Sequence, residues 1–210
     1  AGCGKSTLLS LIAGLIAPEK GCIHFYKSDA MPAAARIGYM LQHDTLLEWR
    51  TIYKNILLGL EVTHQCTEQK KRLAADMMHD YGLASFKNAH PSELSGGMRQ
   101  RAALIRTLVL EPDILLLDEP FSALDYQTRL EVSDDIFRII KEQEKTALLV
   151  THDISEAIAM GEQVIVFSGR PAGIKNVFDI HLSVDKRTPF SSRTAPEFSA
   201  YFHQIWKELS

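Results

Sequence analysis

The residues best suited to chemistry stand at the start of the chain. Residues 1–7 read Ala-Gly-Cys-Gly-Lys-Ser-Thr and match the last seven positions of the phosphate-binding pattern G-x-x-x-x-G-K-S/T followed by Thr. Backbone NH groups in such a loop surround phosphates, Lys5 supplies a positive charge, and the Ser6 hydroxyl can ligate Mg2+. Residues 8–15 are expected to form the helix behind the loop; the alternative is a glycine-rich turn before an amphipathic helix. The positions expected to contact phosphate are Gly2, Cys3, Gly4, Lys5, Ser6 and Thr7.

Two carboxylates end an apolar run in the second half of the chain. Residues 114–117 read Ile-Leu-Leu-Leu and are followed by Asp118, Glu119 and Pro120. This pattern predicts a buried parallel strand that delivers acids at its C-terminal edge, where ligands bind in sheets of this kind. Asp118 is suited to holding Mg2+ through water, and Glu119 to polarising a water for attack on a γ-phosphate. The alternative is a strand end whose acids are simply solvated.

A second candidate anion site lies at residues 94–101, Leu-Ser-Gly-Gly-Met-Arg-Gln-Arg. Ser-Gly-Gly at the start of a helical run places bare backbone NH groups where a phosphate can approach. A lone Ser-Gly-Gly is more often a flexible turn. The functional interpretation therefore depends on the other motifs of the chain.

Two more polar residues follow strand-like runs. Residues 146–150, Thr-Ala-Leu-Leu-Val, end in Thr-His-Asp and so place His152 at a strand edge. A single His is more often structural than catalytic. Gln42 follows the run 36–41, and by itself a Gln is an uninformative polar residue. The order of these motifs along the chain gives them their weight.

Taken together, the motifs resemble those of the nucleotide-binding subunits of ABC transporters, whose signature motif reads like residues 94–101. The resemblance extends over residues 1 to about 170 and includes residues 121–125, Phe-Ser-Ala-Leu-Asp, which match the family's D-loop. It implies that His152 contacts the γ-phosphate and orients the attacking water. It also implies that Gln42 is the Q-loop Gln, which senses Mg2+ and moves with the transmembrane partner.

The resemblance implies an ATPase that uses ATP and Mg2+ and works as a head-to-tail dimer, in which the signature of one subunit closes on the γ-phosphate held by the other. ATP binding and hydrolysis would then close and open an attached membrane channel. The residues implied for catalysis are Glu119, His152, Lys5 and Gln42. The residues implied for nucleotide contact are Gly2, Cys3, Gly4, Lys5, Ser6, Thr7, Gln42, Ser95, Gly96, Gly97, Gln100 and Asp125. The residues implied for the metal are Ser6, Gln42 and Asp118.

Two tetrapeptides resemble the importers of nitrate, sulfonates, taurine and related molecules: residues 48–51, Glu-Trp-Arg-Thr, and residues 168–171, Ser-Gly-Arg-Pro. Those importers usually carry Pro where Glu48 stands. The implied partners are transmembrane permease subunits and, indirectly, a substrate-binding protein, and the implied location is the cytoplasmic face of the membrane. Alternatives are an exporter ATPase, or a non-transport ABC ATPase acting as a clamp. The clamp is disfavoured because the chain has one cassette and no sustained heptads between the phosphate loop and the signature.

Composition is compatible with this interpretation. The chain has 210 residues, a formal net charge of -3 and 46% hydrophobic residues, enough to bury a core and without the basic surplus that would indicate nucleic acid. No apolar stretch approaches the length of a membrane span, so membrane contact is expected through a partner. Cys3, Cys22 and Cys66 are odd in number and widely spaced, which favours a reducing compartment over a disulfide framework.

We therefore predict an α/β fold of the P-loop NTPase type, with a RecA-like parallel sheet and an inserted helical subdomain. Strand-like runs that alternate with helical stretches predict parallel strands; they are residues 21–26, 36–41, 113–118, 146–150 and 162–167. The expected units are a first core part at 1–45, a helical subdomain at 46–108 with helical periodicity over 69–81, a second core part at 109–170, and a tail at 171–210 with a strand at 174–180 and a helix at 197–209. A chain that starts inside the phosphate loop, without Met, is expected to be a fragment, with the family's adenine-stacking aromatic outside it.

Overall fold

The computed structural model describes residues 4–26, 35–169 and 172–209. The predicted phosphate-loop residues Gly2 and Cys3, and half of the second tetrapeptide, lie outside the described residues. Among the described residues, no helix combines the length and apolar character needed to cross a membrane.

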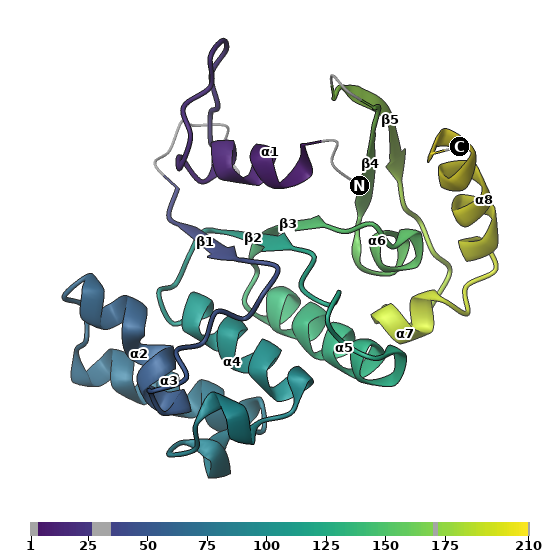
Figure 1. The fold of residues 1–210 in the computed structure, drawn as a ribbon. Helices are drawn as coiled ribbons and strands as arrows, with labels where there is room; N and C mark the ends of the chain where they lie inside the picture. The colour runs from purple at the N-terminus through teal and green to yellow at the C-terminus, as the bar shows by residue number, and fades with distance from the viewer. Residues whose placement is uncertain (1–3, 27–34, 170–171, 210) are drawn as a thin grey trace.

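A three-stranded parallel sheet forms the centre of the molecule (Figure 1). Its strands are β1 (Ile37–Met40), β2 (Ile114–Asp118) and β3 (Thr146–Val150), in the order β1-β2-β3. The middle strand is covered on both faces, which explains why its sequence is continuously apolar rather than alternating. This arrangement confirms the predicted α/β fold with a parallel sheet.

Helices cover the two faces of the sheet (Figure 1). On one face lies α1 (Lys5–Ile12), whose fully buried Leu9 packs with Leu116 and Val150. On the other face lie α4 (Gly96–Leu108) and α5 (Tyr126–Glu142), in the larger cluster that also holds Leu115 and Leu117. Side chains of β2 thus alternate between the two layers, as the pleat of a strand requires.

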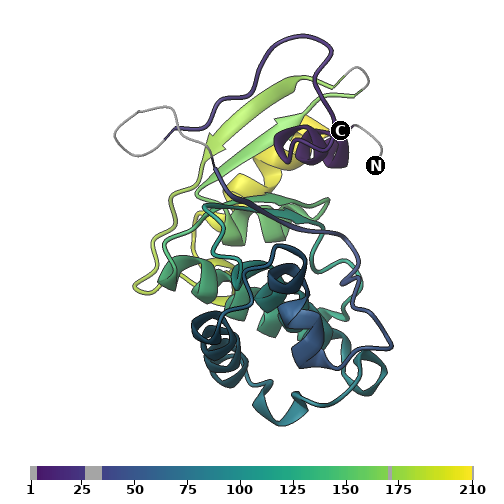
Figure 2. The ribbon, with the colours of Figure 1, turned by 90° about the vertical axis from the view of Figure 1, so that its left-hand side faces the viewer.

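A helical lobe lies beside the sheet, between β1 and the start of α4 in sequence (Figure 2). It contains α2 (Ile52–Val62), α3 (Glu68–Asp80) and the short 3-10 helices η1 (Ala84–Phe86) and η2 (Pro91–Glu93). Thr51 and Thr67 cap α2 and α3, each accepting a hydrogen bond from a backbone NH of the first turn.

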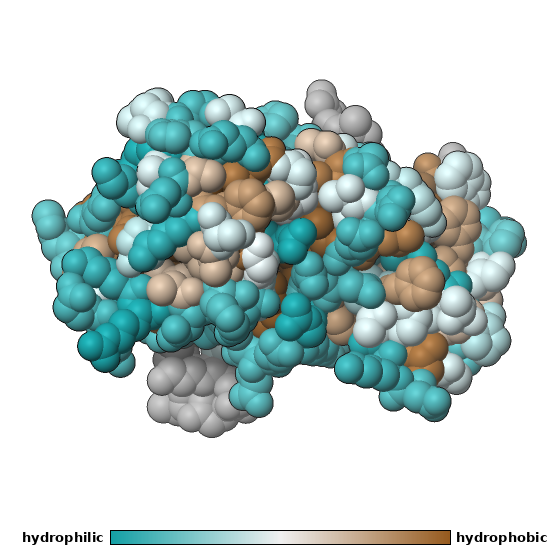
Figure 3. Space-filling model, turned by 90° about the horizontal axis from the view of Figure 1, so that it is seen from below, coloured by the Kyte–Doolittle hydropathy of each residue, from teal (hydrophilic) through white to brown (hydrophobic). Residues whose placement is uncertain are grey.

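Seen from the α4–α5 side, apolar side chains at the surface form separate patches among polar ones (Figure 3). The exact domain boundaries stay a prediction.

In the last part of the chain the predicted strand at 174–180 and the final helix are present, but the strand predicted at 162–167 has a different orientation from the one expected. The run predicted as a fifth parallel strand forms β4 (Gln163–Phe167), which pairs antiparallel with β5 (Ile174–Asp179). The connection between them is short, so antiparallel pairing closes a small loop, whereas a parallel partner would need a long crossover. The helices α6 (Ile154–Met160) and α8 (Phe198–Leu209) pack against β4, while α7 (Pro189–Ser192) packs against α5 and α6. The helix α8 agrees with the predicted final helix.

The sequence predicts a strand over residues 21–26, and this prediction is wrong for the described chain. Only Tyr26 makes a bridge, and the residues before it have no regular structure. An extended run becomes a strand only when a neighbouring strand satisfies its backbone groups, and periodicity alone does not reveal whether such a neighbour exists.

Candidate functional site

Three predicted site residues meet at the C-terminal edge of the parallel sheet. Gln42 follows β1, Glu119 follows β2 and His152 follows β3. Gln42 Nε2 donates a hydrogen bond to Glu119 Oε2 at 3.3 Å, and His152 Nδ1 lies 3.1 Å from the same oxygen. The convergence arises because the ends of neighbouring parallel strands share one edge.

Glu119 occupies a strained backbone position. Its φ is +46°, in the left-handed region that side chains other than glycine rarely adopt. The position is held on both sides: Glu119 N donates to Val150 O at 2.8 Å, and Glu119 O accepts from the amide and hydroxyl of Ser122 at 3.1 and 3.0 Å. Strain of this kind persists only where surrounding contacts impose it, and it is concentrated at functional sites.

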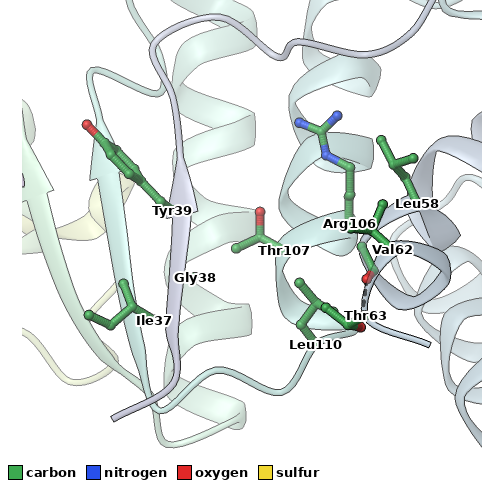
Figure 4. Close-up of a pocket in the computed structure, with 10 residues that line it drawn as sticks. Ile37, Gly38, Tyr39, Leu58, Val62, Thr63, Arg106, Thr107 and Leu110 are labelled. Atoms are coloured by element: carbon green, nitrogen blue, oxygen red, sulfur yellow. Dashed lines mark hydrogen bonds between the residues drawn. The ribbon is translucent and has the colours of Figure 1, made fainter. Parts of the chain in front are cut away.

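Asp118, the last residue of β2, is 7% exposed. Its Oδ2 accepts a hydrogen bond from the Tyr39 hydroxyl at 3.5 Å. Burial raises the pKa of Tyr39 and the nearby Asp118 carboxylate raises it further, so the phenol stays a hydrogen-bond donor at neutral pH. Figure 4 shows Tyr39 and Ile37 on one side of β1, while Thr107 and Arg106 of α4 lie on the other. The sequence analysis did not identify Tyr39. The signal that could have done so is its place in β1, two residues after Ile37, which puts both side chains on the same face of the strand.

The described part of the phosphate loop leads directly into α1. Gly4 is the N-cap of α1 with φ +94° and ψ 14°, a left-handed conformation in which a side chain would be strained. Lys5, Ser6 and Thr7 form the first turn, whose backbone NH groups point toward the N-terminal end of the helix. The first turn contains no acidic residue, so this end of α1 favours an anion.

The predicted signature residues start α4, on the opposite face of the sheet from α1. Ser95 is the N-cap and its Oγ accepts from Met98 N at 3.4 Å. Ser95 and Gly96 are exposed, whereas Gly97 is buried. A Cβ at Gly97 would lie 2.8 Å from Thr128 Cγ2 and 3.0 Å from Val132 Cγ2, both in α5. The second glycine is therefore required for α4 to approach α5, a role that its motif did not reveal.

The two remaining predicted nucleotide contacts differ in exposure. Gln100 is 3% exposed within α4, and its Oε1 has no hydrogen-bond partner in the described chain. Asp125 is exposed and caps α5, with Oδ1 accepting from Thr128 N at 3.1 Å. Among the hydrogen bonds and ion pairs between described residues, none joins Ser95 or Asp125 to Gln42, Glu119 or His152.

An ion pair that the sequence did not reveal ties the segment after Gln42 to the signature helix. The Asp44 carboxylate accepts from Arg99 Nε at 2.8 Å and Nη2 at 3.2 Å, and its backbone carbonyl accepts from Arg106 Nη2 at 2.7 Å. Burial works to raise the pKa of Asp44, but hydrogen bonds from Arg99 and the Leu46 amide outweigh it, and the pKa is lowered. A shift of Gln42 relative to α4 would disturb this pair.

Comparison with known proteins identifies the family. A model described as ABC transporter matches residues 1–122. The chain is a member of the ABC transporter family. An uncharacterized ABC transporter ATP-binding protein of Bacillus subtilis, YtlC, is 49% identical to it, over 100% of this chain and 80% of that protein. The nitrate import ATP-binding protein NrtD of Synechocystis is 39% identical over 97% of this chain and 78% of its own length. The aliphatic sulfonates import ATP-binding protein SsuB of Bacillus subtilis is 35% identical over 99% and 78%.

A solved structure supports both the fold and the activity. It is a dimeric ATP-binding cassette in a post-hydrolysis state with bound ADP and phosphate, and it matches this chain with a TM-score of 0.67 and 28% identity, over 86% of this chain and 82% of that one. The predicted resemblance to ABC transporter ATP-binding subunits is thereby confirmed. The chain is an ATP-binding subunit with the ATPase activity of its family.

Proposed function

We propose that this ATPase powers the import of a small molecule of the nitrate, sulfonate or taurine type. The observation that carries the catalytic part is the meeting of Gln42 and His152 on one oxygen of Glu119. The names of the nitrate and sulfonate import relatives support the direction of transport. The transported molecule itself is bound elsewhere, by permease subunits and a substrate-binding protein.

In the proposed reaction, water attacks the γ-phosphorus of ATP and the bond to the bridging oxygen breaks, releasing ADP and phosphate. Glu119 accepts a proton from the attacking water, and His152 and Gln42 orient the carboxylate and the water. Lys5 and the start of α1 hold the phosphates. The strained backbone of Glu119 keeps the carboxylate at the sheet edge rather than in solvent.

The residues near this edge fit Mg2+. The Ser6 hydroxyl, the Asp118 carboxylate and the Gln42 amide oxygen are hard oxygen donors, which Mg2+ prefers, and it usually retains several waters. The described residues contain no cluster of three or more His, Cys, Asp or Glu that would indicate an all-protein metal cage. Bound Mg2+ would neutralise charge on the phosphates.

We further propose a head-to-tail dimer. Ser95 and Gly96 are exposed at the start of α4, and within the described residues no hydrogen bond or ion pair joins Ser95 to Glu119 of its own subunit. A second anion site without a phosphate loop beside it is completed when a second copy supplies one. The solved relative described as a dimer supports this arrangement.

The proposed contact with the permease lies after Gln42. Trp49 is 76% exposed, a large apolar side chain in a segment held by Asp44 to α4. Exposed aromatic side chains are enriched at protein interfaces. Such docking would place the subunit at the cytoplasmic face of the membrane, as the resemblance implies.

The test uses the full-length subunit assembled with its permease. Glu119→Gln should retain ATP binding, lower turnover by at least about a hundredfold and accumulate an ATP-bound dimer. Lys5→Ala should weaken nucleotide binding itself, and Glu131→Gln, on the exposed side of α5, is the matched control. Parental turnover in Glu119→Gln would remove Glu119 from the mechanism. Uptake of nitrate, an alkanesulfonate or taurine into vesicles tests the import.

A further inference from the structure

A buried carboxylate lies directly behind the turn that carries His152. Glu156, in α6, is 4% exposed. Its Oε2 accepts from Thr151 Oγ1 at 2.7 Å, and the same hydroxyl accepts from Asp153 N at 3.0 Å. Asp153 Oδ1 in turn caps α6, accepting from the amides of Ser155 and Glu156 at 2.7 and 3.2 Å. Both neighbours of His152 are thus held in place.

One guanidinium connects this turn to the loop that begins at Glu119. Arg129 Nη1 lies 3.5 Å from Asp153 Oδ2, and its Nε lies 3.7 Å from Glu156 Oε1. Its Nη2 donates to Leu124 O at 3.1 Å. Leu124 belongs to the loop 119–125 between β2 and α5. Arg129 therefore contacts the loop of one site residue and the turn of the other.

The surroundings of the buried Glu156 carboxylate act on its pKa in opposite directions. Burial raises the pKa of Glu156 and Asp153 raises it further, while Thr151, Arg129 and His152 act to lower it. A buried ion pair gains little stability over well-packed apolar residues, because desolvation offsets the attraction. The ion pair has a larger effect on the positions of the two side chains. When one partner is removed, the remaining charge is unpaired and its side chain moves toward solvent.

We propose that Arg129 is a positioning residue for ATP hydrolysis, which keeps His152 Nδ1 against the Glu119 carboxylate by holding the turn 151–153 and the carbonyl of Leu124 at a fixed separation. This inference rests on the proposed function, in which Glu119 and His152 act on the attacking water. Among the described contacts Arg129 bonds to neither of these two side chains; it acts through the Asp153 carboxylate in one segment and the Leu124 carbonyl in the other.

The test is a double-mutant cycle in the full-length subunit with its permease. Arg129→Met should lower kcat by at least about tenfold while the KM for ATP stays within about twofold, because phosphate binding at α1 is untouched. In a His152→Ala background the same substitution should lower kcat by less than about twofold, since the group that it positions is gone. Arg138→Met is the matched control: Arg138 lies on the same helix and pairs only with Asp135 and Glu142 at the described surface.

Two results would overturn the proposal: unchanged kcat in Arg129→Met, or an equal loss with and without His152. If Arg129→Met does not fold, Glu156→Gln keeps the shape and removes the charge, and it should show the same dependence on His152. Parental turnover in His152→Ala alone would instead refute the proposed function. A drop in His152→Ala together with an undiminished effect of Arg129→Met refutes the positioning role alone.

Discussion

Asn55 provides a sharp test of how the segment after Gln42 is held. This α2 residue is fully buried, and its amide group makes four hydrogen bonds to the loop before the helix. Its Oδ1 accepts from Leu47 N at 2.7 Å, and its Nδ2 donates to the carbonyls of Leu47, Arg50 and Thr51 at 3.0, 3.1 and 3.1 Å. Asn55→Ala removes all four without a polar replacement.

The size of the effect follows from which partners have other bonds. Leu47 O also accepts from Arg50 N, and Thr51 O also accepts from Asn55 N, so these two carbonyls remain paired. Leu47 N and Arg50 O keep no other hydrogen bond within the described chain. Each such group costs about 1 kcal/mol where water reaches it in part, and the removed atoms leave a small void. We expect a loss of roughly 2–3 kcal/mol, or a Tm lower by about 4–12 °C.

The assay combines urea unfolding with hydrogen exchange at the Leu47 amide. In Asn55→Ala that amide should exchange faster than amides of the central sheet, because the loop opens before the domain does. Asn88→Ala, at an exposed position, is the control and should stay within about 0.5 kcal/mol of the parent. An Asn55→Ala protein as stable as that control would show that the loop is held by other contacts.

Two further predictions concern packing and pH. Gly97→Ala places a methyl 2.8 Å from Thr128 Cγ2 and should destabilise the subunit by about 1–3 kcal/mol in urea unfolding, whereas Gly173→Ala, whose nearest new neighbour is 3.6 Å away, should be neutral. Arg36 lowers the pKa of Asp113 from 3.8 to about 2, mainly through its side-chain hydrogen bonds. Asp113 therefore stabilises the fold above about pH 4 and loses this contribution as the pH falls toward 2. Asp113→Asn should be less stable than the parent at pH 6, and the difference should narrow below pH 4; a constant difference would contradict the assignment.

The parts of the fold that could be predicted are those set by local sequence. The apolar runs predicted at 36–41, 113–118 and 146–150 agree with β1, β2 and β3 to within about a residue at each end. Polar residues directly after such strands must gather at one edge, so the meeting of Gln42, Glu119 and His152 follows from the strands themselves.

What could not be predicted depends on partner choice and burial. Residues 163–167 carry a strand pattern that is compatible with either orientation, and only the position of β5 decides it. Arg129 and Glu156 look like solvated charges on two separate helices, because most Arg and Glu side chains are exposed. Their contact depends on how α5 and α6 pack, information that no spacing along the chain contains.

Gly96 and Gly97 of the signature motif are adjacent and identical in sequence, but they lie in different surroundings in the structure. Gly97 is buried, and its missing side chain is explained within one subunit by the approach of Thr128 on α5. Gly96 is exposed, and a Cβ at this position would lie 3.1 Å from Leu124 Cδ2. A substitution at Gly97 therefore perturbs the fold before any partner arrives, and its loss of activity would say little about a dimer. Ser95 and Gly96 are exposed, so substitutions there disturb the packing of the subunit less than a substitution at Gly97 does. A change in ATP-dependent dimerisation caused by such a substitution therefore tests the contact with a second copy.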